Sequence, residues 1–145
     1  MTIKSKKTVC AIVLLNQRGE ALLQLRDKKV GLSASGLWVF PGGHIENNET
    51  LNDCARREFF EETGYKCENL NYLLSIEDNF ISNESKMLHI FYESYDFKKK
   101  YICLEGVALE FLSFEKAKEL KMPDYLLCIW QLAVLALKAK QSKIY

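Results

Sequence analysis

The stretch of sequence that decides the fold is "GHIENNETLNDCARREFFEETGY", which runs from Gly43 to Tyr65. An apolar stripe with the spacing of an α-helix begins at Leu51 and continues through Cys54 and Ala55. The next positions on this stripe are three carboxylates: Glu58, Glu61 and Glu62. At about 100° per residue they lie within an arc of roughly 100° on one face. Because like charges at this spacing repel one another, the stripe needs an explanation other than packing.

Local signals at both ends of this stretch predict a helix of about fourteen residues. Thr50 is the expected N-cap, and Asp53 follows three residues later in a position that resembles a capping box. Gly64 stands where a helix ends in the left-handed conformation.

Three explanations are open for the acidic stripe. The first is a solvated face, although Phe59 and Phe60 occupy the other side of the helix. The second is an ion-pair network in which Arg57 holds Glu49 and the preceding loop. The third is a divalent cation, because Mg²⁺ prefers oxygen ligands and is held by a few carboxylates together with substrate phosphates. The spacing alone does not choose between them.

Composition describes an ordinary water-soluble protein. The chain has 145 residues, of which 48% are hydrophobic and 27% charged, and its net charge is +1. We therefore expect one domain over residues 1–145, with no nucleic acid polymer and no membrane surface as a partner. The five cysteines form no CxxC pair, so we expect reduced, buried thiols in a cytoplasmic protein rather than a zinc site. We expect the apolar run 9–15 to be a strand rather than a targeting segment, since it leads into a turn and a second apolar run.

The rest of the chain alternates between strand and helix patterns. Residues 9–15 and 21–26 predict a β-hairpin, and residues 37–46 predict short extended pieces around a Pro-Gly-Gly turn. Strands are expected at 72–80, 87–97 and 107–113, with a polar turn at 81–85 between the first two. A short helix at 114–120 and a long one at 125–139 complete a mixed α/β layer architecture.

The acidic stretch resembles the signature of the Nudix hydrolase family. That signature is a glycine, five residues, a glutamate, seven residues, Arg-Glu, a bulky apolar residue, any residue, Glu-Glu, any residue, a glycine and a bulky apolar residue. This chain fills every slot, with Gly43, Glu49, Arg57, Glu58, Phe59, Glu61, Glu62, Gly64 and Tyr65. The preceding "LWVFPGG" looks like the lead-in of MutT-like members, although Val39 stands where that lead-in often has glutamate. The resemblance implies an α/β (α+β) fold, the Nudix α/β/α sandwich with a mixed β-sheet between helices.

The resemblance also implies roles by position. The metal ligands and catalytic acids of the family correspond to Glu58, Glu61 and Glu62, which would bind Mg²⁺ (or Mn²⁺), and one of them also acts as general base. The backbone carbonyl of Gly42 corresponds to a further metal ligand. The positions that shape the motif correspond to Gly43, Glu49, Arg57 and Gly64, with Arg57 and Glu49 as an ion pair.

Three residues outside the motif are further candidates, each with an alternative. Glu105 lies between strands in the second half and is a candidate catalytic glutamate or an exposed loop residue. Arg26 ends the second strand and is a candidate phosphate ligand or a surface arginine. Asp124 follows Pro123 and is a candidate contact to a nucleotide base or the N-cap of the last helix.

The family's reaction is hydrolysis of a diphosphate linkage in a nucleoside diphosphate attached to a group X. The chain has no proline between Pro41 and Pro123, where ADP-ribose-type members carry one. By elimination we expect a MutT-like pyrophosphohydrolase acting on a nucleoside triphosphate, a small-molecule nucleotide substrate. The alternatives are a nucleotide-sugar or ADP-ribose-type hydrolase, or a non-catalytic Nudix-fold module. Homodimers are common in the family, so the resemblance allows a homodimer, but no interface can be identified in the sequence.

Overall fold

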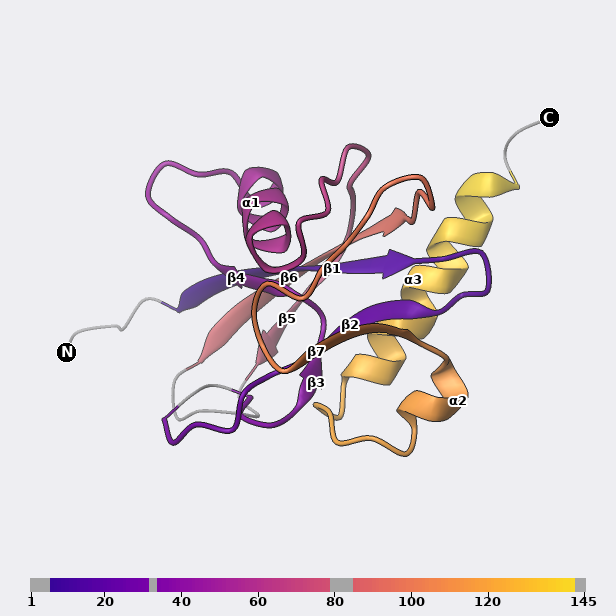
Figure 1. Cartoon of the computed structure of the whole chain (residues 1–145). Helices are drawn as coiled ribbons and strands as arrows, with labels where there is room; N and C mark the ends of the chain where they lie inside the picture. Colours follow the sequence, from indigo (N-terminus) through magenta and orange to yellow (C-terminus); the bar gives the residue numbers. More distant parts are fainter. Residues whose placement is uncertain (1–5, 32–33, 79–84, 143–145) are drawn as a thin grey trace.

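The computed structural model describes residues 6–31, 34–78 and 85–142, and Figure 1 shows their arrangement. In these residues the helices are α1 (Leu51–Thr63), α2 (Phe114–Ala117) and α3 (Leu126–Gln141). The strands are β1 (Lys7–Leu15), β2 (Ala21–Leu25), β3 (Trp38–Val39), β4 (Gly42–His44), β5 (Asn71–Asp78), β6 (Lys86–Ser94) and β7 (Ala108–Leu112).

The strands form one mixed sheet. Its main order is β3-β2-β1-β6-β5, while β4 pairs with β1 and β7 pairs with β2. β1 and β6 run parallel, from Lys7 opposite Lys86 to Leu15 opposite Ser94, and the other paired strands of the described residues are antiparallel. The parallel pair lies at the centre of the sheet, where both faces can be covered by helices.

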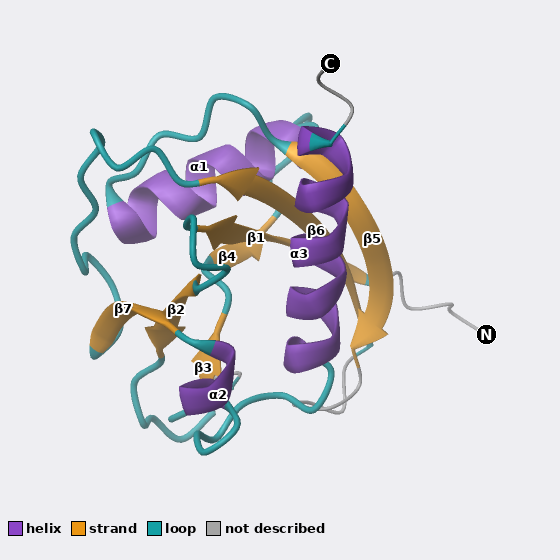
Figure 2. Ribbon diagram, turned by 90° about the vertical axis from the view of Figure 1, so that its right-hand side faces the viewer, coloured by secondary structure: helices purple, strands orange, loops and turns teal. Residues whose placement is uncertain are grey.

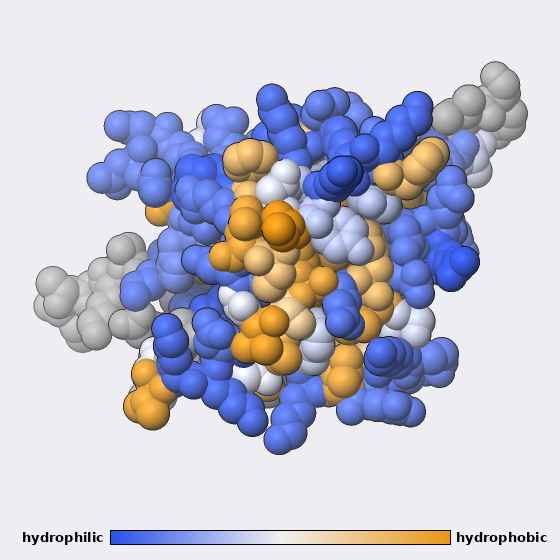
Figure 3. All heavy atoms as spheres, viewed as in Figure 1, coloured by the Kyte–Doolittle hydropathy of each residue, from blue (hydrophilic) through white to orange (hydrophobic). Residues whose placement is uncertain are grey.

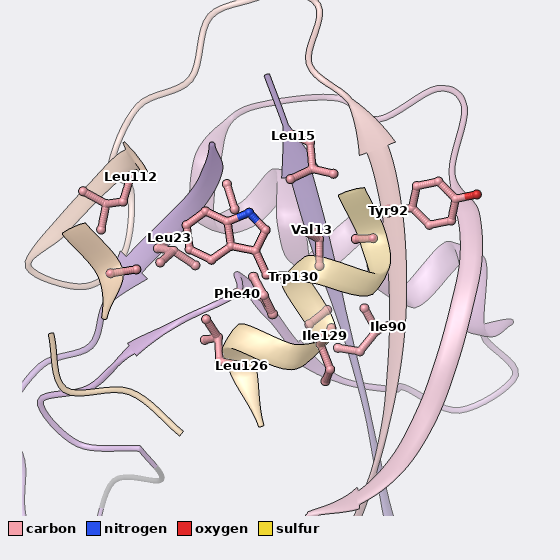
Figure 4. Close-up of a cluster of buried hydrophobic side chains, with 14 of the residues drawn as sticks. Val13, Leu15, Leu23, Phe40, Ile90, Tyr92, Leu112, Leu126, Ile129 and Trp130 are labelled. Atoms are coloured by element: carbon pink, nitrogen blue, oxygen red, sulfur yellow. The ribbon is translucent and has the colours of Figure 1, made fainter. Parts of the chain in front are cut away.

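Helices α1 and α3 cover opposite faces of this sheet (Figures 1 and 2). Alternate residues of β1 therefore enter two different cores. Cys10 and Ile12 pack on the α1 side with Phe59, whereas Val13 packs on the α3 side with Trp130. Figure 4 shows the α3 side, where the indole of Trp130 lies among side chains from the sheet and the helix. The α/β/α sandwich with a mixed sheet is confirmed.

Residues 101–106 belong to the connection between β6 and β7 and pass along the C-terminal end of α1. The amide of Ile102 donates to the carbonyl of Thr63 at 2.8 Å, and the amide of Leu104 donates to the carbonyl of Glu62 at 3.0 Å. These two backbone hydrogen bonds bring Glu105 close to α1.

Ile102 and Leu104 are themselves exposed apolar side chains. Figure 3, which views the molecule from the same side as Figure 1, shows hydrophobic side chains gathered near the centre and hydrophilic ones around them.

Most of the predicted elements are present, with limits that differ by a few residues. The predicted turn at 81–85 lies outside the described residues except for Ser85, and so do residues 32 and 33 of the loop before β3. All five cysteines are free, as expected, and Cys10, Cys54 and Cys67 are buried. The expectation of burial is wrong for Cys103, in the exposed 101–106 segment, and for Cys128, on the outer side of α3. No helix in the described part of the chain is long and apolar enough to cross a membrane.

Candidate active site

Helix α1 is fixed at both ends by its own sequence. The hydroxyl of Thr50 accepts a hydrogen bond from the amide of Asp53 at 3.1 Å, so the predicted N-cap is confirmed. Gly64 has φ = 68°, and its amide donates to the carbonyl of Phe60 at 2.8 Å. A left-handed residue at this position is far easier for glycine than for residues with a Cβ atom. These ends determine which side chains α1 presents to the sheet.

Two glycines in β4 let α1 approach the sheet closely. A Cβ atom on Gly42 would lie 2.6 Å from the Cα of Ala11 in β1 and closer still to the carbonyl oxygen of Cys10. A Cβ atom on Gly43 would overlap the carboxylate of Glu58, which crosses directly above it. The first glycine is therefore required by backbone packing, and the second leaves room for an acidic side chain of α1.

Arg57 joins the acidic residues of α1 to the preceding loop. Its Nε donates to Glu49 Oε2 at 2.7 Å and its Nη2 to Glu49 Oε1 at 2.9 Å, a two-bond pair. Its Nη1 donates to Glu58 at 2.8 Å, and its Nη2 donates to the carbonyl of His44 at 3.0 Å. Hydrogen bonding to Arg57 lowers the pKa of Glu49 to about 2. The guanidinium of Arg57 thus holds the loop and the helix together.

The three glutamates of the stripe have different environments. Glu61 is exposed and meets Arg57 at 3.4 Å, Glu58 is half-buried, and Glu62 is only 2% exposed. Burial, followed by repulsion from Glu105, raises the pKa of Glu62 to about 8. Burial also raises the pKa of Glu58, although Arg57 opposes the shift. The solvated-face explanation therefore fits Glu61 but not the other two.

One cavity of about 290 Å³ collects most of the predicted residues. Its acidic part is formed by Glu58, Glu62 and Glu105, which come from α1 and from the 101–106 segment. The predicted residues Arg26 and Gly42 also line it, together with Gly43. The remaining wall is mainly apolar, with polar groups from β5, β6 and the start of α3: Val9, Ala11, Ala34, Val39, Phe40, His44, Asp78, Lys86, Leu88, Pro123, Tyr125 and Leu126.

Five predicted residues do not line this cavity. Glu49 and Arg57 lie behind it as the ion pair, Gly64 ends α1, Glu61 faces outward and Asp124 is exposed. The N-cap alternative for Asp124 is wrong, because α3 begins at Leu126 and its N-cap position is Tyr125. A tight turn, with the amide of Leu126 donating to the carbonyl of Pro123 at 3.1 Å, starts the helix instead.

Sequence reasoning missed two polar residues of this region. Gln24 is buried in β2, and its Nε2 donates to Glu62 Oε2 at 2.6 Å. Tyr125 lines the cavity and donates its hydroxyl hydrogen bond to Asp78 Oδ2 at 3.0 Å. The available signal for Gln24 was a lone amide in the apolar strand "ALLQL".

Comparison with known proteins places this fold and motif. A family model described as "NUDIX domain" matches residues 4–125. The chain belongs to the Nudix family. Its match to "8-oxo-dGDP phosphatase NUDT18" of Mus musculus is 35% identical over 79 residues, which is 52% of this chain and 23% of that protein. Its match to "Oxidized purine nucleoside triphosphate hydrolase" of Danio rerio is 35% identical over 81 residues, which is 55% of this chain and 50% of that protein.

The solved structures agree on the fold of this Nudix domain. The MutT protein from Methanosarcina mazei Go1 superposes with a TM-score of 0.76 at 20% identity, covering 99% of both chains. At that identity the likeness shows the fold alone. The chain spans 23% and 50% of the length of the two curated relatives. The match therefore shows membership of the Nudix family but does not identify a substrate.

The acidic residues of this Nudix domain do not already form a metal site. In the described part of the chain, no three Asp, Glu, His or Cys side chains are gathered at metal-binding distances. Glu58 is hydrogen-bonded to Arg57, and Glu62 is hydrogen-bonded to Gln24. The donor set nevertheless suits a hard cation, because it consists of carboxylate oxygens, and the absence of a Cβ atom on Gly43 gives one of them, that of Glu58, its place against β4.

The buried acid predicts a specific pH dependence of stability in the presence of a chelator. In the unfolded chain Glu62 loses its proton near its ordinary pKa of 4.5, whereas the folded protein keeps the proton up to about pH 8. The free energy of unfolding should therefore fall as the pH rises between these values, relative to a Glu62→Gln variant. Urea unfolding of both proteins at several pH values measures this difference. A difference that stays constant over this range would show that Glu62 is not held protonated.

Proposed function

We propose that this protein is a Mg²⁺-dependent hydrolase that cleaves a diphosphate linkage in a nucleoside triphosphate or another nucleoside diphosphate linked to X. The observation that carries the proposal is the shared cavity. Glu58, Glu62 and Glu105 reach it from two separate parts of the chain, and Arg26 faces it from β2's end. In such a cavity the carboxylates can hold a metal ion, the guanidinium of Arg26 can hold a phosphate chain, and the apolar wall can hold a nucleoside.

Glu58, Glu62 and the carbonyl of Gly42 would hold the cation at the cavity, and Glu61, which faces outward, would have to turn toward the cavity to join them. The repulsion of Glu62 by Glu105 and Glu58 supports this assignment, because a bound cation would compensate it. When bound, Mg²⁺ supplies neutralisation of phosphate oxygens and polarisation of the bond that breaks. Mn²⁺ has the same ligand preferences and is the alternative ion.

The chain's own residues supply the remaining chemistry. A carboxylate among Glu58, Glu62 and Glu105 orients the attacking water and takes its proton. Arg26 supports the phosphate chain: its Nε is buried and makes no hydrogen bond within the described residues. An unpaired buried donor is costly, so a phosphate oxygen is a suitable partner for it. Phe40 and the apolar wall exclude water around the nucleoside, and Asp124, exposed beside Pro123 at the edge of this wall, would contact its base.

A nucleotide of modest size is the proposed substrate, rather than a nucleic acid polymer. The relatives named for 8-oxo-dGDP and for oxidised purine nucleoside triphosphates make oxidised purine nucleotides the first compounds to test. ADP-ribose and nucleotide sugars are the alternatives that the assay should separate. The cytoplasmic location and the homodimer stay predictions.

A substrate panel tests the proposed function. The purified protein is incubated with Mg²⁺ and canonical or oxidised nucleoside triphosphates, ADP-ribose or nucleotide sugars, and released phosphate and pyrophosphate are measured. We expect turnover of at least one nucleoside triphosphate, and loss of that turnover when a chelator removes the cation. Binding of a nucleotide without turnover of any compound in the panel would instead support a non-catalytic binding module.

A further inference from the structure

Gln24 is a buried polar residue in an otherwise apolar strand. Its neighbours in the sheet are Val39 of β3 and Leu109 of β7, and the side chain is only 2% exposed. Burying an amide costs free energy unless its polar atoms find partners. The partners of Gln24 therefore indicate why an amide, rather than a leucine or valine, occupies this position.

The amide of Gln24 joins two distant parts of the chain. Its Nε2 donates to the carboxylate Oε2 of Glu62 at 2.6 Å and to the backbone carbonyl of Glu105 at 3.3 Å. A backbone carbonyl can only accept a hydrogen bond, so the nitrogen of the amide must face these two oxygens. Both hydrogens of one NH₂ group are thus used to connect α1 with the 101–106 segment.

Backbone hydrogen bonds also hold the segment that carries Glu105 against α1 and β2. The amide of Leu104 donates to the carbonyl of Glu62, and the amide of Val107 donates to the carbonyl of Leu25 at 2.8 Å. Gly106 has φ = +82°, and a Cβ atom there would lie 2.6 Å from the carbonyl oxygen of Leu25. The segment therefore lies tightly between α1 and β2, with Gln24 at the point where all three meet.

We infer that Gln24 is a positioning residue, which fixes the orientation of the Glu62 carboxylate and holds the Glu105 segment beside it. Through these two bonds, the acids of α1 and of the 101–106 segment face one cavity. The catalytic consequence rests on the proposed function, whereas the docking of the segment does not. Residues that orient metal-binding or catalytic groups typically change affinity or rate by about 10- to 100-fold when they are lost.

Gln24→Met tests this role, because methionine keeps the length and apolar packing but cannot donate. We expect kcat for the best substrate of the panel to fall about 10- to 100-fold, with KM changed by less than about threefold. Hydrogen exchange at the amide of Leu104 should become faster, because the segment loses the hydrogen bond that holds the carbonyl of Glu105. Gln131→Met is the matched control, since Gln131 is exposed on α3.

Gln24→Glu provides a second variant of nearly the same size. The introduced carboxyl group has at most one hydrogen to donate and cannot make both bonds of the NH₂ group, so kcat should again fall about 10- to 100-fold. A wild-type level of kcat in this variant would overturn the inference. The inference would also be overturned if Gln24→Met and Gln131→Met had the same kcat and the same rate of hydrogen exchange at the amide of Leu104.

The two proposals fail in different ways. Absence of turnover in the wild-type protein would defeat the proposed function, whatever Gln24 does. Exchange at Leu104 is measured without substrate or cation, so it still decides the docking role of Gln24 in that case. Faster exchange in Gln24→Met supports the inference, and unchanged exchange overturns it.

Discussion

Replacing Glu62 by glutamine is expected to lower kcat about 10²- to 10⁴-fold, the usual contribution of a catalytic acid or base. Glu62 is buried at the cavity and is held by Gln24, so its role depends on charge in a fixed place. The amide that replaces it has the same shape, and its oxygen can still accept from Gln24. The variant should therefore fold normally. Steady-state kinetics with the best substrate of the panel measure the change.

Glu119→Gln is the control for this substitution, because it removes an exposed carboxylate beyond the short helix α2. It should leave kcat within about twofold of wild type, as most surface substitutions do little. If Glu62→Gln matched this control, the buried carboxylate would have no part in the reaction. The cation would then have to be held by the more exposed acids alone.

Replacing Gly42 by alanine is expected to destabilise the protein by about 3 kcal/mol or more, the upper end for overpacking. The added Cβ atom would meet the backbone of Cys10 and Ala11 in β1, and backbone atoms cannot turn aside as a side chain can. The pairing of β4 with β1 would have to open. Urea unfolding of the variant and of wild type gives the difference in unfolding free energy.

The adjacent substitution Gly43→Ala serves as its partner, with a different expected outcome. Here the three atoms nearest to the added Cβ atom all belong to the carboxylate of Glu58, and a side chain can move away at the cost of its hydrogen bond to Arg57. We expect a stability loss below about 1 kcal/mol, together with a fall in kcat of about 10- to 100-fold because Glu58 is displaced. Equal stability losses in the two variants would mean that β4 does not lie as close to β1 and α1 as described.

The extent of α1 and the position of its acids could be predicted because the signals are local. Threonine is favoured at the start of a helix and glycine just after its end, and the structure places the helix between Thr50 and Gly64. The mixed sheet followed from the alternation of strands and helices and from the family resemblance. The buried position of Glu62 was not predictable from the stripe, because periodicity gives a direction around the helix but not what covers it.

The parts that could not be predicted depend on contacts between distant segments. The parallel pairing of β1 with β6 is set by the whole sheet, and no residue in either strand specifies it. Gln24 and Tyr125 gain their importance from partners far away in the sequence, Glu62 and Asp78. The N-cap alternative for Asp124 rested on its position directly after a proline, but the turn at Pro123 starts the helix one residue later.

Metal binding by the acids of α1 is tested most directly by a crystal structure with Mn²⁺ and a non-hydrolysable nucleoside triphosphate, in which anomalous scattering locates the metal. We expect manganese bonded to oxygens of Glu58 and Glu62 and to phosphate oxygens, at distances near the roughly 2.1 Å of Mg²⁺ sites. Manganese bound elsewhere, with both carboxylates away from the phosphate chain, would contradict this expectation.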